Sequence, residues 1–163
     1  MKNSYDLYII KNGIAFPKQL QKKQLCSMER SGLSVVTVCP SLTLGPLLQS
    51  TYQTGKEETV ENRARAFVDV RDVAEAVIMV YEKPEASGRY ICAPHMISMR
   101  DLVDKLRSMY PNYNYPKKFE DTNDQMLVSS EKLKSLGWKY RPLEETLADT
   151  VQCFQESGLV NKV

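Results

Sequence analysis

The loop that follows a buried strand is the first place where this sequence could do chemistry. The stretch VVTVCPSLTLGP, residues 35–46, begins with β-branched residues that indicate a buried strand, which ends at Pro40 because proline cannot donate to a central ladder. The turn formers of this stretch are Pro40, Ser41, Gly45 and Pro46. Ligands bind at the carboxyl ends of strands in open α/β sheets, so we expect this loop to contact a ligand. The alternative is a strand end that binds nothing.

The sole histidine and a tyrosine-rich stretch have simpler explanations than chemistry. His95 in APHMIS could act as a general base, but no carboxylate or nucleophile is spaced beside it, so we interpret it as a histidine in a solvated loop. The stretch YPNYNYPKKF, residues 110–119, could stack on nucleic acid. An extended linker that packs on the domain explains its alternating proline and tyrosine better.

The composition indicates one domain and a small-molecule partner. A chain of 163 residues can bury one modest core. Its net charge of +2, with acids and bases well mixed, argues against nucleic acid or a membrane surface as a partner. No apolar run approaches a membrane span, and MKNSYDLYII lacks a signal-length apolar region, so we expect a cytoplasmic protein.

The four cysteines are predicted to be reduced and structural. They are Cys26, Cys39, Cys92 and Cys153, which lie far apart in the chain, each in or beside an apolar stretch. This spacing suits buried thiols better than disulfides or a metal cluster, so we expect no metal site.

Strand and helix patterns alternate along the chain, which predicts an α/β fold. A strand at 34–39 is followed by a polar loop region, and AFVDV at 66–70 gives a second short strand. The next stretch, VRDVAEAVIMVYEKP, predicts a helix with Asp72 as its N-cap and Pro84 beyond its end. The apolar face of this helix consists of Val73, Ala76, Val77 and Val80.

The second half of the chain continues the pattern. GRYICAP predicts a short strand, and SMRDLVDKLRSMYP predicts a helix that Ser98 caps, with Asp101 in its first turn, and that Pro111 stops.

The tail predicts two further helices that pack on a core. Ser130 caps the first, which ends at Gly137, and Trp138 then anchors the helix end in the core. The second runs from Leu143 to Glu156, with an apolar stripe at Leu147, Val151 and Phe154.

Four separated blocks of this sequence match one known family in the same order. They are RSGLSVVTVCPSLTLGPLLQ, AFVDVRDVAEAVIMVYEKPEASGRYIC, RDLVDKLRSMYPNYNYPKKF and SSEKLKSLGWKYRPLEETL. These blocks closely resemble the C-terminal part of plant cinnamoyl-CoA reductase-like proteins, which are extended short-chain dehydrogenases with dihydroflavonol reductase as a close relative. The resemblance runs from about Arg30 to about Leu159.

The resemblance implies a fold and an activity. The fold is the C-terminal, substrate-side portion of a Rossmann-type extended short-chain dehydrogenase, formed by residues 30–163, with most of the parallel sheet missing. The activity is an NADP(H)-dependent reduction in which hydride passes to a thioester or carbonyl carbon of a small molecule, hydroxycinnamoyl-CoA or a related phenylpropanoid-type compound.

The resemblance also implies roles for individual residues. In the family, the Pro-Ser after this strand lies beside the nicotinamide, so Pro40, Ser41 and Leu42 match the cofactor-contacting loop. Asp69 and Asp72 match a segment behind the substrate region, and we interpret both as structural, serving as helix caps and loop ties.

Residues that the family needs for turnover have no counterpart in this sequence. The family binds the cofactor pyrophosphate at a glycine-rich turn, and no pair among the seven glycines has that spacing. Its catalytic tyrosine stands four residues before a lysine on one helix, and no such pair occurs before Arg30. The stretch between Leu48 and Glu58 is too short for the helix that covers the substrate. We therefore assign no catalytic residue and expect a truncated chain that is inactive alone and binds NADP(H) poorly.

The alternative from another class is a non-catalytic interaction protein that docks on a full-length paralogue. The strand at 35–39 is apolar on both faces, which is typical of a parallel strand between neighbours, and we expect those neighbours to be missing. The exposed edge and apolar area would then recruit a partner chain or cause self-association.

Residues 1–29 form an atypical N-terminal segment. Their second half is compatible with a helix that ends near Gly32. The stretch NGIAFPK, residues 12–18, can spell Trp-Tyr-Cys-Leu-Ser-Lys when each codon is read from its third base, and this string resembles the catalytic helix of the family. We hypothesise that the segment is an out-of-frame translation. The alternative is a coincidence of codon degeneracy.

Overall fold

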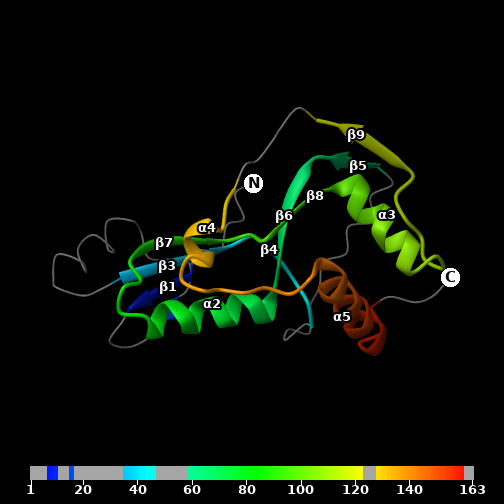
Figure 1. Cartoon of the computed structure of the whole chain (residues 1–163). Helices are drawn as coiled ribbons and strands as arrows, with labels where there is room; N and C mark the ends of the chain where they lie inside the picture. Colours follow the sequence, from blue (N-terminus) through cyan, green and yellow to red (C-terminus); the bar gives the residue numbers. More distant parts are fainter. Residues whose placement is uncertain (1–6, 11–14, 17–34, 47–58, 123–127, 160–163) are drawn as a thin grey trace.

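The computed structural model describes most of the chain after Val35 and two short pieces before it. The described ranges are 7–10, 15–16, 35–46, 59–122 and 128–159. Their strands form three small sheets, with helices packed beside them (Figure 1). The fold is α/β, as the sequence predicts.

The largest sheet surrounds the strand that leads into the candidate loop. Its strands, in spatial order, are β2 (Ala15–Phe16), β1 (Leu7–Ile10), β3 (Val35–Pro40) and β7 (Gly88–Cys92). β3 runs antiparallel to β1 and parallel to β7, so both of its edges are paired. The predicted strand and the strand predicted for GRYICAP are confirmed. The prediction that the neighbours of β3 are missing is wrong, because the apolar stretch LYII and the strand β7 occupy both sides.

The strands that follow the loop in the chain form most of two smaller sheets. One has the order β4 (Leu42–Leu44), β6 (Ala64–Asp69) and β8 (His95–Ser98), with β4 parallel and β8 antiparallel to β6. The other is a parallel pair of β5 (Thr59–Asn62) and β9 (Lys118–Asp121). Part of the predicted polar loop region is therefore a strand, because residues 59–62 find a partner far along the chain.

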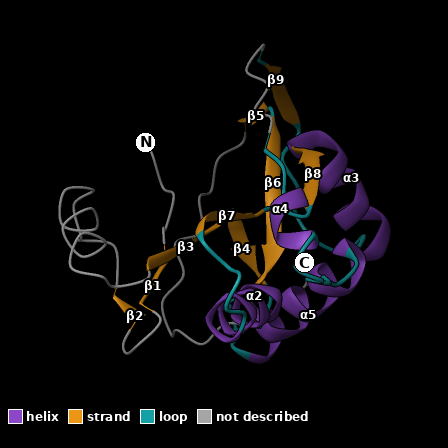
Figure 2. Ribbon diagram, turned by 60° about the vertical axis from the view of Figure 1, so that its left-hand side comes forward, coloured by secondary structure: helices purple, strands orange, loops and turns teal. Residues whose placement is uncertain are grey.

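The helices follow the predicted order. They are α2 (Val70–Glu82), α3 (Met99–Met109), the single turn α4 (Glu131–Lys134) and α5 (Leu143–Glu156). Figures 1 and 2 show α3 and α5 beside β6 and β8, at the opposite end of the molecule from β1 and β2.

The N-cap of α2 is Asp69, and the prediction of Asp72 is wrong. Asp69 ends β6 in an extended conformation, and its Oδ1 accepts a hydrogen bond from the Arg71 backbone N–H at 2.8 Å. Asp72 lies inside the first helical turn and is fully buried. The predicted cap of α3 is confirmed: the Ser98 hydroxyl accepts from the Asp101 backbone N–H at 3.0 Å and donates to the Asp101 carboxylate at 2.7 Å.

The segment around α4 is anchored differently from the prediction. Ser130 stands at the N-cap position, but its hydroxyl accepts from the Ala93 backbone N–H at 2.8 Å, so it ties α4 to the end of β7. Gly137 has a φ of +94°, the left-handed conformation that ends the turn after α4. Trp138 is buried as predicted, and its indole N–H donates to the Asp72 carbonyl at 3.0 Å.

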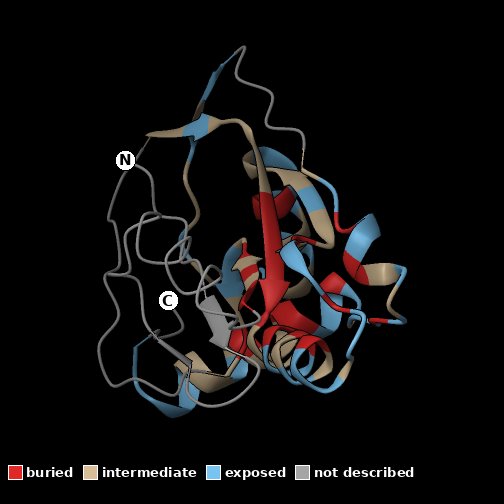
Figure 3. Cartoon of the chain, turned by 90° about the vertical axis from the view of Figure 1, so that its left-hand side faces the viewer, coloured by how far each residue is buried: buried red, intermediate tan, exposed pale blue. Residues whose placement is uncertain are grey.

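The buried side chains form two clusters. The first, between the β3–β7 sheet and α2, contains Val36, Val38, Val68, Val73, Ala76, Val80, Ala86, Tyr90, Cys92, Leu133 and Trp138. The second, between β6, α3 and α5, contains Phe67, Leu102, Leu143 and Leu147, with half-buried neighbours such as Leu44 and Leu106. Figure 3 shows that the buried residues gather where strands meet helices, while the outer surfaces of the helices are exposed.

The described cysteines are Cys39, Cys92 and Cys153, and no two of them form a disulfide with each other. Cys92 belongs to the first cluster, and burial, with a smaller contribution from the charge of Asp72, raises the pKa of its thiol to about 12. Cys92 is therefore a neutral apolar filler at physiological pH, as predicted.

His95 corrects another prediction. It lies half-buried in β8 rather than in a solvated loop, with its Nε2 2.7 Å from the Arg141 carbonyl oxygen. Its ring is edge-on to that of Tyr140, with 5.2 Å between the ring centroids. Tyr140 and Arg141 come from the tail of the chain, so the local sequence around His95 gives no sign of them.

Several predictions lie outside the described residues. These are Cys26, the helix ending near Gly32, the shifted-frame stretch 12–18 apart from Ala15–Phe16, and the segment between Leu48 and Glu58. Of the residues that are described, none forms a helix long and apolar enough to cross a membrane.

Candidate substrate and cofactor site

A cavity of about 1090 Å³ lies among β4, β6, α3 and α5. Its apolar wall includes Leu44, Phe67, Leu102, Leu106, Leu147 and Phe154. Its polar groups include Arg65, Tyr110, Tyr113, Asn114, Tyr115 and Thr150. Small-molecule sites have volumes of about 300–1,000 Å³, with apolar walls and few polar groups. The cavity is therefore large enough for an aromatic small molecule.

The candidate loop forms part of this cavity. Leu42 lines it, and 41% of the Leu42 surface is exposed, although β4 pairs with β6. The loop begins where the Ser41 backbone N–H donates to the Cys92 carbonyl at 2.9 Å. Pro40, Ser41 and Leu42 thus run from the buried end of β3 to the cavity wall.

The Ser41 hydroxyl is a buried polar group of the loop without a hydrogen-bond partner among the described residues. A buried hydroxyl without a partner is costly, and such groups recur where a ligand completes the hydrogen bonding. The chemistry of the loop, an apolar side chain beside a free hydroxyl, fits the nicotinamide side of a dinucleotide.

Tyrosines hold the rim of the cavity. The Tyr115 hydroxyl lies 2.7 Å from the Tyr110 carbonyl and 3.0 Å from the Leu106 carbonyl, to which it can donate, and Gln155 donates to the Tyr113 hydroxyl at 2.6 Å. Burial raises the pKa of Tyr115, so this phenol stays protonated at neutral pH. The tyrosine-rich stretch packs on α3 and α5, as predicted for a linker.

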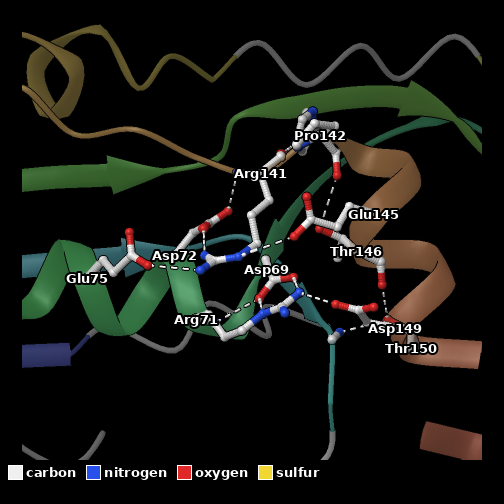
Figure 4. Close-up of polar contacts among 12 residues, drawn as sticks. Asp69, Arg71, Asp72, Glu75, Arg141, Pro142, Glu145, Thr146, Asp149 and Thr150 are labelled. Atoms are coloured by element: carbon white, nitrogen blue, oxygen red, sulfur yellow. Dashed lines mark hydrogen bonds and ion pairs between the residues drawn. The ribbon is translucent and has the colours of Figure 1, made fainter. Parts of the chain in front are cut away.

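A carboxylate–guanidinium chain fixes the start of α2 against α5. Arg71 donates to both carboxylate oxygens of Asp69, at 2.9 and 2.7 Å, and also pairs with Asp149 of α5 at 2.7 Å (Figure 4). Burial alone would raise the pKa of Asp69, but the hydrogen bonds and charge of Arg71 and a hydrogen bond with Thr146 lower it below its ordinary value. The Asp69 carboxylate is therefore charged and serves as a helix cap.

Arg141 forms a second tie between the same elements. Its guanidinium pairs with the buried carboxylate of Asp72, and its backbone N–H donates to Asp72 at 2.9 Å. The guanidinium also reaches Glu75 of α2 at 3.0 Å and Glu145 of α5 at 3.6 Å (Figure 4). Asp72 thus ties the segment before α5 to α2, the structural role that the sequence suggested.

Sequence reasoning found the loop and missed the cavity. Leu147, Val151 and Phe154 were predicted as a core-packing stripe, and all three line the cavity instead, although Leu147 is also buried. Thr150 is a site residue that the sequence analysis did not single out. Its position three residues after Leu147 on the same helix face is the only sequence signal for it.

The fold is that of the extended short-chain dehydrogenases. Vestitone reductase from alfalfa (Medicago sativa) superposes with a TM-score of 0.68 at 24% identity, covering 83% of this chain and 49% of that one. Yeast methylglyoxal/isovaleraldehyde reductase Gre2, solved with NADPH, superposes with a TM-score of 0.54 at 23% identity, covering 76% of this chain and 46% of that one.

The sequence is similar to cinnamoyl-CoA reductases. Cinnamoyl-CoA reductase 1 of Oryza sativa subsp. japonica is 38% identical over 143 residues, which are 79% of this chain and 42% of the rice protein. The resemblance found in the sequence is thereby confirmed: the chain is a relative of the plant cinnamoyl-CoA reductases. It spans less than half the length of the first curated relatives that it matches. No protein-family model matches it.

Proposed function

We propose that this chain supplies the substrate-side wall of an NADP(H)-dependent reductase of the cinnamoyl-CoA reductase type. The reaction passes hydride to a thioester or carbonyl carbon of a small phenylpropanoid-type molecule, such as a hydroxycinnamoyl-CoA. The observation that carries the proposal is Leu42, which belongs to the cofactor-matching loop and also lines the cavity. A substrate in this cavity would lie against Leu42, one of the three residues that match the nicotinamide loop.

The residues of this chain would act by binding and orienting. NADPH, when bound, supplies the hydride, and Pro40, Ser41 and Leu42 would hold its nicotinamide side. The apolar wall would bind the aromatic part of the substrate and exclude water, and the tyrosine rim offers hydrogen bonds to its oxygens. Support for the cofactor comes from Gre2, which was solved with NADPH.

These 163 residues alone are proposed to be inactive. They contain neither the glycine-rich turn that holds a pyrophosphate nor a Tyr–Lys pair of catalytic spacing before Arg30. We further propose that residues 30–163 are the reductase part and that residues 1–29 are an out-of-frame segment. Codons at 12–18 that do not spell the catalytic string in the shifted frame would contradict the latter.

Titration with NADPH tests the proposal. The purified chain should show no saturable change in NADPH fluorescence at micromolar concentrations and no NADPH consumption with a hydroxycinnamoyl-CoA. A complete cinnamoyl-CoA reductase is the matched control and should show both. Saturable micromolar binding by the chain alone would mean that its residues rebuild the whole cofactor site.

A second candidate function is a non-catalytic protein that docks on a full-length paralogue. The outer face of α2 favours it, because Ile78 and Tyr81 stand three residues apart with 54% and 53% of their surfaces exposed. Co-purification with a full-length reductase, lost on Ile78→Ser, would support docking. Equal recovery of the variant would exclude this face.

A further inference from the structure

Thr150 connects the cavity to the candidate loop. Its side chain lines the cavity and is nearly buried, with 7% exposed. Its Oγ1 accepts a hydrogen bond from the Gly45 backbone N–H at 2.8 Å and donates to the Thr146 carbonyl at 2.6 Å. One hydroxyl therefore joins the end of the loop, the interior of α5 and the wall of the cavity.

Gly45 fits closely against the start of α2. Its φ is +117°, and a Cβ atom built on it would lie 3.1 Å from Val70 Cγ1 and 3.2 Å from Asp69 Oδ1. A side chain at this position would force its neighbours to shift by a few tenths of an ångström and would strain the backbone. The Gly45 N–H is held in one place and points to Thr150.

The loop is held at both ends, by elements of different kinds. At its start, the Ser41 N–H bonds to β7, which belongs to the closed core. Along β4, the backbone pairs with β6, with Leu44 opposite Asp69. At its end, Thr150 provides the tie to α5, a helix that also lines the cavity through Leu147, Val151 and Phe154.

We infer that Thr150 is a positioning residue that sets the loop containing Ser41 and Leu42 relative to the cavity wall. A molecule that contacts α5 in the cavity is thereby coupled to the loop through the bond from Gly45 to Thr150. This inference rests on the proposed function, in which the same loop contacts the nicotinamide and the cavity holds the substrate.

The helix does not depend on Thr150 for its place. α5 is also anchored by Leu147 in the second cluster and by the ion pair between Asp149 and Arg71. Removing the Thr150 hydroxyl should therefore release the loop end while α5 stays in position.

Amide hydrogen exchange of the full chain tests the tie without any ligand. Thr150→Val keeps the shape and deletes the acceptor, so the Gly45 amide should exchange at least about tenfold faster, because its donor loses a buried partner. The Val38 amide in β3 should keep its wild-type rate. Thr150→Ser should restore slow exchange at Gly45.

Ser157→Ala is the matched control. The Ser157 hydroxyl donates to the Cys153 carbonyl at 2.8 Å, the same bond to the preceding turn of α5, but it does not line the cavity. This variant should leave the Gly45 rate unchanged. Equal Gly45 exchange in wild type and Thr150→Val, or failure of Thr150→Ser to restore it, would overturn the inference.

A cavity probe separates positioning from mere packing. Cinnamyl alcohol, an uncharged aromatic, should slow Gly45 exchange in the wild type and shift the Leu42 amide resonance. In Thr150→Val it should still shift the Val151 methyls but no longer affect Gly45. If cinnamyl alcohol still slows Gly45 exchange in Thr150→Val, the inference is overturned. If the probe does not bind to the wild type at all, the proposed function is refuted, while the exchange result without ligand still stands.

Discussion

The two buried clusters differ in whether they border the cavity. The first cluster, around Val36, Leu133 and Trp138, is closed by the β3–β7 sheet, α2 and the segment that includes α4. The second cluster shares with the cavity wall the residues Leu44, Phe67, Met99, Leu102, Leu106 and Leu147. No described residue of the first cluster lines the cavity. The first cluster is therefore a closed core, whereas the side chains of the second cluster both pack in a core and line the cavity.

The first cluster should be the most sensitive to truncation. Leu133 is fully buried, so Leu133→Ala should lower the free energy of unfolding by about 2–5 kcal/mol through lost burial and an internal void. Urea unfolding followed by Trp138 fluorescence measures the loss. A loss below about 1 kcal/mol would contradict the closed character of this cluster.

The second cluster should lose less stability and more binding. Leu147 faces the cavity, so Leu147→Ala enlarges an existing space and should cost about 2 kcal/mol, mainly the transfer free energy of the removed carbons. At the same time the affinity for cinnamyl alcohol should fall, while Leu133→Ala leaves it unchanged at a temperature where both variants are folded. The distinction between the clusters would be wrong if Leu147→Ala lost more stability than Leu133→Ala, and if Leu133→Ala lowered the affinity for cinnamyl alcohol more than Leu147→Ala.

Acid should weaken the junction that joins the two regions. The pKa of Asp69 is lower in the folded chain than its ordinary value of 3.8, so its charge stabilises the fold above that value, and this stabilisation is lost as the pH falls through the lowered pKa. The contribution is about 1.5–3 kcal/mol, the range for hydrogen bonds to charged groups. Unfolding free energies measured from about pH 6 down to about pH 2 should fall more steeply for wild type than for Asp69→Asn, since the variant lacks this titration. Parallel curves would show that Arg71 does not stabilise the charged form.

The outer face of α2 should contribute least to the free energy of unfolding. Ile78 is 54% exposed and belongs to neither cluster, so Ile78→Ser should change the free energy of unfolding by less than about 0.5 kcal/mol. Thermal unfolding of the isolated chain checks this. A large loss would contradict the placement of Ile78 outside both buried clusters.

Local signals in the sequence predicted the helices and the central strand. Ser98 with Asp101 marks the start of α3, and the spacing of Val73, Ala76 and Val80 marks the buried face of α2. The shift of the α2 cap from Asp72 to Asp69 shows the limit of such signals, because both aspartates precede apolar residues at helical spacing.

Long-range contacts explain most of what the sequence did not reveal. β5 and β9 pair residues separated by about sixty positions, Thr59 with Lys118, and neither strand has a distinctive local pattern. The cavity is lined from several elements, so the sequence of α5 predicts a core-packing stripe although part of that stripe faces open space. The pairing of Gly45 with Thr150 likewise joins residues 105 positions apart.

A methyl-resolved NMR titration of the chain with cinnamyl alcohol tests the central claim, that the loop and the cavity form one substrate-side wall. The methyl groups of Leu42, Leu106 and Val151 should shift together along one saturable curve, while those of Val36 and Leu133 in the closed cluster stay unchanged. Shifts confined to the closed cluster, or shifts of Val151 without Leu42 on the same curve, would contradict it.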